Sequence, residues 1–249
     1  MDKSLHIFGI HTVQEALENG HTIDKVWLLQ GERSPLFRQL ENRLRTQNIS
    51  FRYVPKDKFN AHKEKNHQGV MARLAPVPLF DFESLLEATA HESEKQPLYL
   101  LLDHITDTHN LGAIMRSAAA TGVTALVMPE TGSAPLNATT IKTSAGAMFE
   151  LKIAKVRHLK DALFLLQAHD IPTLGLSEKA THNAYETSLT GPIAVVMGSE
   201  DKGIHPSLLK ILDQTVRLPM VSKVTSLNVS VATGLILYEI LRQRNYPKS

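Results

Sequence analysis

Short runs that are apolar at every position constrain the fold of this chain more than any other feature. Leu98-Tyr-Leu-Leu-Leu102 and Ile193-Ala-Val-Val-Met197 show no alternation between apolar and polar residues. A strand of this kind is covered on both faces, which is typical of a parallel sheet with helices on either side. Helical patterns separate these runs from others between residue 97 and the end. We therefore predict a parallel-sheet α/β domain over residues 97–249, with ligands bound at the carboxyl ends of its strands.

The preceding part of the chain predicts a smaller α/β unit and a connecting segment. Residues 76–96 combine a proline-punctuated extended piece with a short acidic helix, a composition typical of a linker. We expect a first domain at 1–75, a linker at 76–96 and the second domain at 97–249. Within the first domain the patterns predict strands at 6–9, 25–29, 49–54 and 69–74, and helices at 12–18 and from Pro35.

Positive charge is concentrated in one part of the chain. The net charge is only +2, yet residues 31–75 carry ten Lys or Arg against four acidic residues. Such a segment is the usual footprint of a partner with a phosphate backbone, and a solvated charged surface is the alternative.

Other classes of protein are disfavoured by what the sequence lacks. No apolar run approaches the ~20 residues of a membrane span, and the start MDKSLHIFGI has no signal-peptide core. The chain has no cysteine, which excludes disulfides and thiolate metal sites and fits a reducing cytoplasm. Its twelve histidines do not follow metal-ligand spacing, and neither G-x-G-x-x-G nor G-x-S-x-G occurs. We therefore expect a cytoplasmic protein with no metal site and no membrane partner.

A polar loop and a helix follow the run at 98–102. The sequence there is Asp103-His-Ile-Thr-Asp-Thr-His-Asn-Leu-Gly-Ala-Ile-Met-Arg116. Asn110 is expected to cap the helix, and Arg116 lies less than two turns into it. An arginine in a helix that is otherwise small and apolar must snorkel, form a salt bridge, or bind a phosphate or carboxylate.

A second polar stretch, Met197-Gly-Ser-Glu-Asp-Lys-Gly203, follows the run at 193–197. Its glycine spacing is similar to that of a phosphate loop, but the required Lys-Ser/Thr pair is missing. Gly198 would let the backbone approach a ligand closely, and Glu200 places a carboxylate beside it. A tight turn is the alternative interpretation.

The third stretch, Ser-Leu-Asn-Val-Ser-Val-Ala at 226–232, precedes a strongly helical pattern. Ser226, Asn228 and Ser230 are of the types that cap helix N-termini and accept hydrogen bonds from free backbone N–H groups. A strand, a polar loop and a helix start together favour a place where a ligand is held.

Taken together and in this order, N-x5-R, G-S-E and S-L-N-V-S-V-A resemble the three motifs of the SPOUT methyltransferases. The resemblance is closest to the SpoU/TrmH branch of RNA ribose 2′-O-methyltransferases, and Leu136-Asn-Ala-Thr-Thr140 is similar too. It covers essentially the whole chain, because the basic first domain looks like the L30e-like substrate-binding domain of that branch. Three positions depart from the family pattern, which has Gly, Gly and Pro where this chain has Ser222, Asp201 and Thr108.

The resemblance implies a fold, a cofactor and two sets of residues. It implies a deep trefoil knot in the second domain, S-adenosyl-L-methionine as cofactor, and a homodimer that acts on RNA. Contacts to the cofactor are implied for Gly198, Leu218 and Leu227. Catalytic or motif roles are implied for Asn110, Arg116, Glu200, Ser226 and Asn228.

The activity that the resemblance implies is methylation of the ribose 2′-oxygen of a guanosine in 23S ribosomal RNA. Family proposals use the arginine as the base, but a guanidinium stays protonated near neutral pH and resists deprotonation. We expect Arg116 to bind the phosphate beside the target ribose, Asn110 and Asn228 to orient the substrate, and Glu200 to fix the loop or Arg116. Two alternatives stay open: a transfer RNA ribose methyltransferase, and a non-catalytic dimeric protein that binds RNA or assists ribosome assembly.

Overall fold

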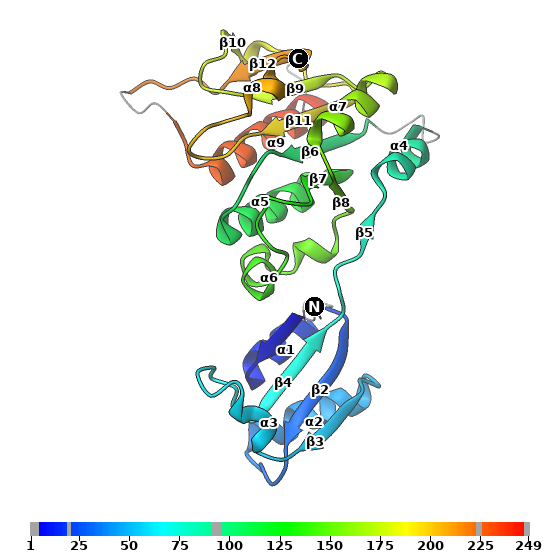
Figure 1. Ribbon diagram of the computed structural model, residues 1–249, viewed down its shortest axis with the longest axis vertical. Helices are drawn as coiled ribbons and strands as arrows, with labels where there is room; N and C mark the ends of the chain where they lie inside the picture. Colours follow the sequence, from blue (N-terminus) through cyan, green and yellow to red (C-terminus); the bar gives the residue numbers. More distant parts are fainter. Residues whose placement is uncertain (1–4, 19–20, 91–95, 223–225, 247–249) are drawn as a thin grey trace. The chain divides into compact units, whose positions relative to one another are not determined.

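The computed structural model describes residues 5–18, 21–90, 96–222 and 226–246 (Figure 1). By its internal contacts the chain divides into two units, Met1–Val77 and Pro78–Ser249, and each has a sheet of its own. No helix within these described ranges is both long and apolar enough to cross a membrane.

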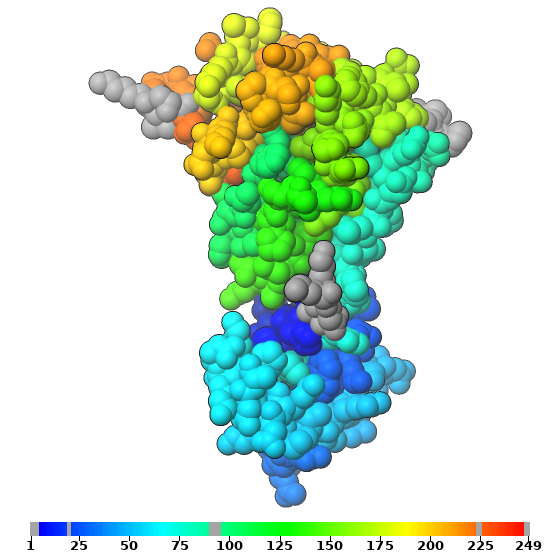
Figure 2. All heavy atoms as spheres, in the orientation of Figure 1, coloured from blue at the N-terminus to red at the C-terminus, as the bar shows by residue number. Residues whose placement is uncertain are grey.

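The N-terminal unit is built on a four-stranded sheet of order β1-β4-β2-β3. Strand β4 runs antiparallel to β1 and β2, while β2 and β3 are parallel. The space-filling view shows the segment around α3, in cyan, at the surface of this unit (Figure 2). The elements in chain order are β1 (Leu5–Phe8), α1 (Ile10–Glu18), β2 (Ile23–Leu29), α2 (Pro35–Thr46), β3 (Phe51–Val54), α3 (Asp57–Asn60) and β4 (Val70–Leu74).

The core of this unit follows from the sequence pattern. Helix α2 begins at Pro35, whose fixed φ suits the first helical turn. Its buried residues Phe37, Leu40 and Leu44 recur every three or four positions and so form one apolar stripe. In β2, Val26 and Leu28 are fully buried, whereas the residues beside them are partly exposed. The prediction of a small α/β unit is therefore confirmed.

The segment expected to be a linker is instead largely built into the C-terminal unit. Strand β5 (Leu79–Phe80) pairs in parallel with β8 (Ile153–Val156). Helix α4 (Phe82–Ala90) places Phe82, Leu85 and Leu86 in the core of that unit. These three side chains recur at helical spacing, and their burial outweighs the entropy gained by leaving the segment free. The division between units lies at Val77 and Pro78.

The C-terminal unit contains an eight-stranded sheet in which every neighbouring pair is parallel, with the order β10-β12-β9-β11-β6-β7-β8-β5. This confirms the predicted parallel-sheet α/β fold; the trefoil knot stays a prediction. Besides those already given, its elements are β6 (Leu98–Leu102), α5 (Thr108–Ala120), β7 (Ala125–Pro129), α6 (Ala138–Ser144), α7 (Leu159–Ala168), β9 (Thr173–Leu176), β10 (His182–Asn183), β11 (Ile193–Met197), α8 (Pro206–Leu209), β12 (Gln214–Arg217) and α9 (Val229–Asn245).

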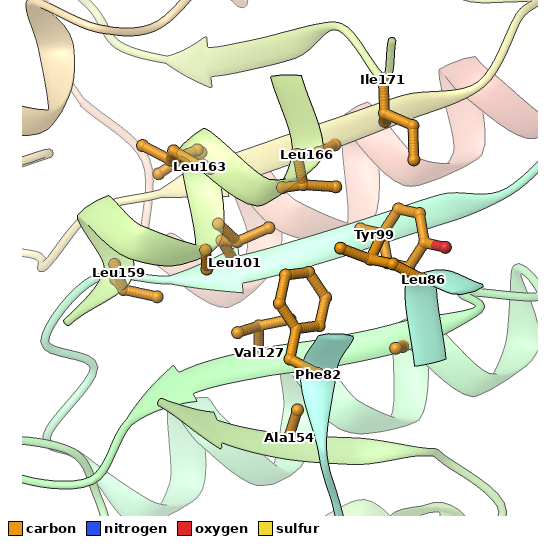
Figure 3. Packing of buried hydrophobic residues seen from close by; sticks show 14 of the residues in the cluster. Phe82, Leu86, Tyr99, Leu101, Val127, Ala154, Leu159, Leu163, Leu166 and Ile171 are labelled. Carbon is orange, nitrogen blue, oxygen red and sulfur yellow. The ribbon is translucent and has the colours of Figure 1, made fainter. Parts of the chain in front are cut away.

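The sheet is covered on both faces, which explains the uninterrupted apolar runs. On one face, alternate residues of β6 pack with α4 and α7 in a single cluster that includes Tyr99, Leu101 and Leu163 (Figure 3). Leu98, Leu100 and Leu102 alternate with these and are also buried, so they face the opposite side of the sheet. Helix α5 packs against both α6 and α9, and at Gly112 of α5 an added Cβ would lie 2.6 Å from the Cβ of Thr143.

Candidate active site

The three polar stretches meet because of the order of the strands. Strands β6 and β11 are neighbours, so the loops that leave their carboxyl ends lie side by side. The N–H of Asp103, at the end of β6, donates to the carbonyl oxygen of Met197 at 2.8 Å. Helix α5 begins after the first loop, and Glu200 lies on the second.

Asn228 joins the three stretches through its side-chain amide. Its nitrogen donates to Oδ1 of Asn110 at 3.0 Å and to Oε1 of Glu200 at 2.5 Å, which uses both of its hydrogens. Its oxygen accepts from the N–H of Ser230 at 2.9 Å and of Val231 at 3.4 Å. Asn228 therefore caps α9, as predicted, and also fixes the side chains that come from α5 and from the loop after β11.

Asn110 does not cap α5, contrary to the prediction. The N-cap is Asp107, whose carboxylate accepts from the N–H of Asn110 at 2.7 Å. A carboxylate at that position also suits the positive end of the helix dipole. Asn110 consequently lies in the first turn, and its side-chain oxygen accepts from Asn228. Within the described part of the chain its amide nitrogen has no recorded partner, so it remains available as a donor to a ligand.

The absence of a side chain at Gly198 lets two parts of one loop approach each other closely. The sequence had predicted a close approach of this backbone to a ligand. An added Cβ would lie 2.0 Å from the carbonyl carbon of Gly203 and 2.1 Å from the nitrogen of Ile204. The backbones of Ser199 and Gly203 bond to each other in both directions, at 3.1 and 2.9 Å. The neighbour that excludes a side chain at Gly198 is thus the far side of its own loop, and contact of Gly198 with the cofactor stays a prediction.

Asp103 is a structural residue of the site that the sequence reasoning did not single out. Its side chain is buried, with Oδ2 accepting from the N–H of His205 at 2.7 Å and Oδ1 lying 2.6 Å from Nδ1 of His104. Asp103 therefore ties the end of β6 to the far end of the 198–205 loop. The sequence did contain a signal for this role, since Asp103 directly follows a fully apolar strand. A buried carboxylate at such a position needs hydrogen-bond partners.

Arg116 lies outside this hydrogen-bonded cluster. Its side chain is exposed on α5, and no described residue forms a hydrogen bond or an ion pair with it. The salt-bridge alternative is therefore not supported by the residues that the structure describes. An exposed guanidinium with all its donors available is suited to bind a phosphate.

Two of the three residues expected to contact the cofactor, Gly198 and Leu218, lie at the carboxyl ends of strands, whereas Leu227 lies just before α9. Strand β9 lies between β11 and β12, so Gly198 after β11 and Leu218 after β12 are at the same edge of the sheet. Gly198 and Leu218 are buried, Leu227 is partly buried and Ser226 is exposed.

A cavity of about 580 Å³ opens at a different part of the same edge. It lies where β6, β7 and β8 end, and its lining includes Asp103, Glu130, Arg157 and Lys160. None of the site residues predicted from the sequence lines it. The site predicted from the sequence is therefore separate from this cavity, and its centre is the hydrogen-bonded cluster of Asn110, Glu200 and Asn228.

Comparison with known proteins places the fold and these residues in a family. The pattern of the SpoU rRNA methylase family matches residues 97–238, and that of the RNA 2′-O ribose methyltransferase substrate-binding domain matches residues 6–80. The chain belongs to the SpoU rRNA methylase family. The family resemblance found in the sequence is thereby confirmed.

Relatives and solved structures match nearly the whole chain. The 23S rRNA (guanosine-2′-O-)-methyltransferase RlmB of Pasteurella multocida is 38% identical, over 97% of this chain and 99% of its own length. RlmB of Escherichia coli K12 is 36% identical, over 96% of this chain and 98% of its own length. The SpoU methyltransferase AviRb of Streptomyces viridochromogenes, solved in complex with AdoMet, has the same fold. Its TM-score is 0.74 at 24% identity, over 96% of this chain and 90% of that one.

The residues present fit S-adenosyl-L-methionine, and the prediction of this cofactor is confirmed by the family. Three adjacent parallel strands, β11, β9 and β12, end at one edge of the sheet, the place where α/β proteins bind ligands. The two leucines that are predicted to contact the cofactor, Leu218 and Leu227, are buried and partly buried, and Met220 is 37% exposed. Apolar walls with a few convergent backbone groups are typical of cofactor sites.

Proposed function

We propose that this protein methylates the ribose 2′-oxygen of a guanosine in 23S ribosomal RNA. One observation carries the proposal: a single amide, that of Asn228, joins the helix of Asn110, the loop of Glu200 and the start of α9. Relatives that are named for this activity match the chain over both of its units, which supports ribosomal RNA as the substrate. An enzyme acting on that substrate works where ribosomes are assembled, so we expect a cytoplasmic location.

The chemistry asks the chain to position the hydroxyl and to stabilise charge. When bound, S-adenosyl-L-methionine supplies an electrophilic methyl group on its sulfonium. Asn110 orients the ribose hydroxyl with its available amide nitrogen. Glu200 accepts from Asn228 with Oε1, and its second carboxylate oxygen remains to accept from the substrate. Arg116 binds the phosphate next to the target ribose through two parallel hydrogen bonds. Its fixed positive charge stabilises the negative charge that develops on the ribose oxygen.

The active unit in this proposal is a homodimer that pairs through α9. Val231, Leu235 and Tyr238 are 51%, 42% and 54% exposed and recur at i, i+4 and i+7, so they form one uncovered apolar stripe. Exposed apolar stripes of this kind mark protein interfaces. Leu235→Glu should shift the protein to monomers in sedimentation. The matched control is Phe164→Glu, on the 47% exposed Phe164 of α7, which should remain dimeric.

The test is methyl transfer from labelled S-adenosyl-L-methionine to 23S ribosomal RNA that lacks its own ribose methylations, with transfer RNA alongside. Label on a guanosine ribose of the ribosomal RNA is the expected result. Label on transfer RNA alone would move the substrate and keep the chemistry. No label on either RNA, with cofactor and RNA both bound, would overturn the proposal in favour of a non-catalytic RNA-binding protein.

A further inference from the structure

One face of the N-terminal sheet gathers aromatic and basic side chains. Val26 and Leu28 of β2 are fully buried, and because side chains alternate along a strand, Lys25 and Trp27 lie on the opposite face. Strand pairing extends this face across the sheet. His6 and Lys25 both lie opposite Arg73, Phe8 and Trp27 both lie opposite Met71, and Arg52 lies opposite Trp27. We call this set the aromatic face: His6, Phe8, Lys25, Trp27, Arg52, Met71 and Arg73.

The rings of the aromatic face are in contact with one another. The ring centroids of His6 and Trp27 are 5.7 Å apart, with an interplanar angle of 32°. His62, from the segment after α3, continues the row at 6.5 Å from His6 and 4.8 Å from Phe8. All four rings are only partly buried, so ring surface is open to solvent. Together the rings of Trp27, His6, His62 and Phe8 form a row that these three ring contacts link.

Two cations border this row. The Nζ atoms of Lys25 and Lys58 each lie 5.9 Å from the centroid of the Trp27 ring. Among the residues that the structure describes, neither lysine forms an ion pair, whereas Arg73 is paired with Asp24. In the part of the chain that the structure describes, these two positive charges lie beside partly exposed rings and have no acidic partner of their own. A ligand that supplies both flat rings and negative charge would complement them.

We propose that the aromatic face binds unpaired RNA nucleotides, with bases stacked on the Trp27–His6 row and phosphates at Lys25 and Lys58. The inference rests on the proposed function and deepens it, by assigning substrate recognition to this one face of the first unit. Proteins recognise unpaired RNA by stacking splayed bases on aromatic rings, whereas bases in a duplex already stack on each other. The chemistry therefore selects single-stranded segments over paired ones.

Trp27 provides a direct test because it is the only tryptophan in the chain. Its intrinsic fluorescence reports on the aromatic face alone, in the full protein and without any catalytic step. Titration with oligoadenylate should quench this emission, while an RNA duplex of the same length should quench it much less. Oligoadenylate that fails to bind, or that binds by anisotropy without changing Trp27 emission, would overturn the proposal.

Variants give an independent readout. Trp27→Ala should weaken binding of oligoadenylate by roughly tenfold, the loss typical of one stacked base, and Trp27→Phe should retain most of it. Leu36→Ala is the control, since Leu36 is uncharged and 44% exposed on α2 rather than on the aromatic face. Because these substitutions lie in the N-terminal unit, which has a sheet of its own, circular dichroism and thermal unfolding of the full protein report whether each variant is folded. Equal affinity of the Ala and Phe variants and wild type would refute the proposal, and methyl transfer to ribosomal RNA would still test the proposed function separately.

Discussion

The side-chain nitrogen of Asn228 donates to Oε1 of Glu200 across 2.5 Å, and the same nitrogen donates to Asn110 across 3.0 Å. The three residues come from different strand ends, so their contact depends on the whole sheet. One amide oxygen meanwhile holds the start of α9. Asn228 thus has a structural function, capping, and a positioning function, and the two can be separated by substitution.

Replacing Asn228 by Ser and by Ala separates the two functions. Ser is as good an N-cap as Asn but is too short to reach Asn110 and Glu200, whereas Ala can do neither. Asn228→Ala should lower the free energy of unfolding by about 1 kcal/mol, and Asn228→Ser by much less. Both should lose methyl transfer, measured beside urea unfolding curves. Full activity of the Ser variant would show that the positioning hydrogen bonds are dispensable.

Substitution of Arg116 should affect catalysis and leave stability unchanged. Arg116 is exposed, so Arg116→Lys should alter the free energy of unfolding by less than about 0.5 kcal/mol. Lysine keeps the charge and loses the two-pronged contact, which should slow methyl transfer by roughly 10- to 100-fold. Cofactor affinity, measured by calorimetry, should not change. Lys152→Arg, exposed at the opposite end of the sheet, is the matched control, and near-normal turnover of Arg116→Lys would contradict the phosphate-binding role.

A methyl group at Gly198 should prevent closure of the 198–205 loop. The added Cβ would overlap the backbone of Gly203 and Ile204, which has no flexible end that could move aside. Gly198→Ala should therefore cost about 3 kcal/mol and abolish cofactor binding, as followed by thermal unfolding and titration. At Gly191 an added Cβ meets no atom within 4 Å, so Gly191→Ala should be neutral. If both variants melt like the wild type, the close packing of this loop is not required.

Asp213 should make stability depend on pH in the acidic range. Burial acts to raise the pKa of Asp213, but hydrogen bonds from the hydroxyl and N–H of Thr173, at 2.6 and 2.8 Å, outweigh it and hold the pKa below its usual value. A lowered carboxyl pKa contributes stability above the unfolded-state value of about 3.9, and this contribution is lost as the pH falls below it.

The variant Asp213→Asn isolates that contribution. It should be less stable than the wild type at pH 7, by about 1 kcal/mol, and equal to it at a pH well below 4. Thermal unfolding of both proteins across this range measures the difference. A stability difference that is independent of pH would show that the lost interaction does not involve the charged carboxylate. Thr173→Val serves as control, because it removes the hydroxyl partner and should lessen the pH dependence.

Local patterns were sufficient for much of this protein. The runs at 98–102 and 193–197 are strands covered on both faces, and the helix predicted to begin at Pro35 does begin there. Asn228 as a cap also followed from residue type and position. Asn110 was misjudged because two residues near one helix start, Asp107 and Asn110, are both good caps, and the backbone course between them decides which is used.

The sequence by itself determined the secondary structure, the parallel sheet, the basic first unit and the motifs of the family. The tertiary structure decided which residues meet. The strand order brings residues 110, 200 and 228 together, and tertiary packing draws α4 onto the core. The physical reason is that strand and helix propensities act over a few neighbouring residues. Contacts between strand ends depend on which parallel strands become neighbours, and the spacing along the chain does not specify that.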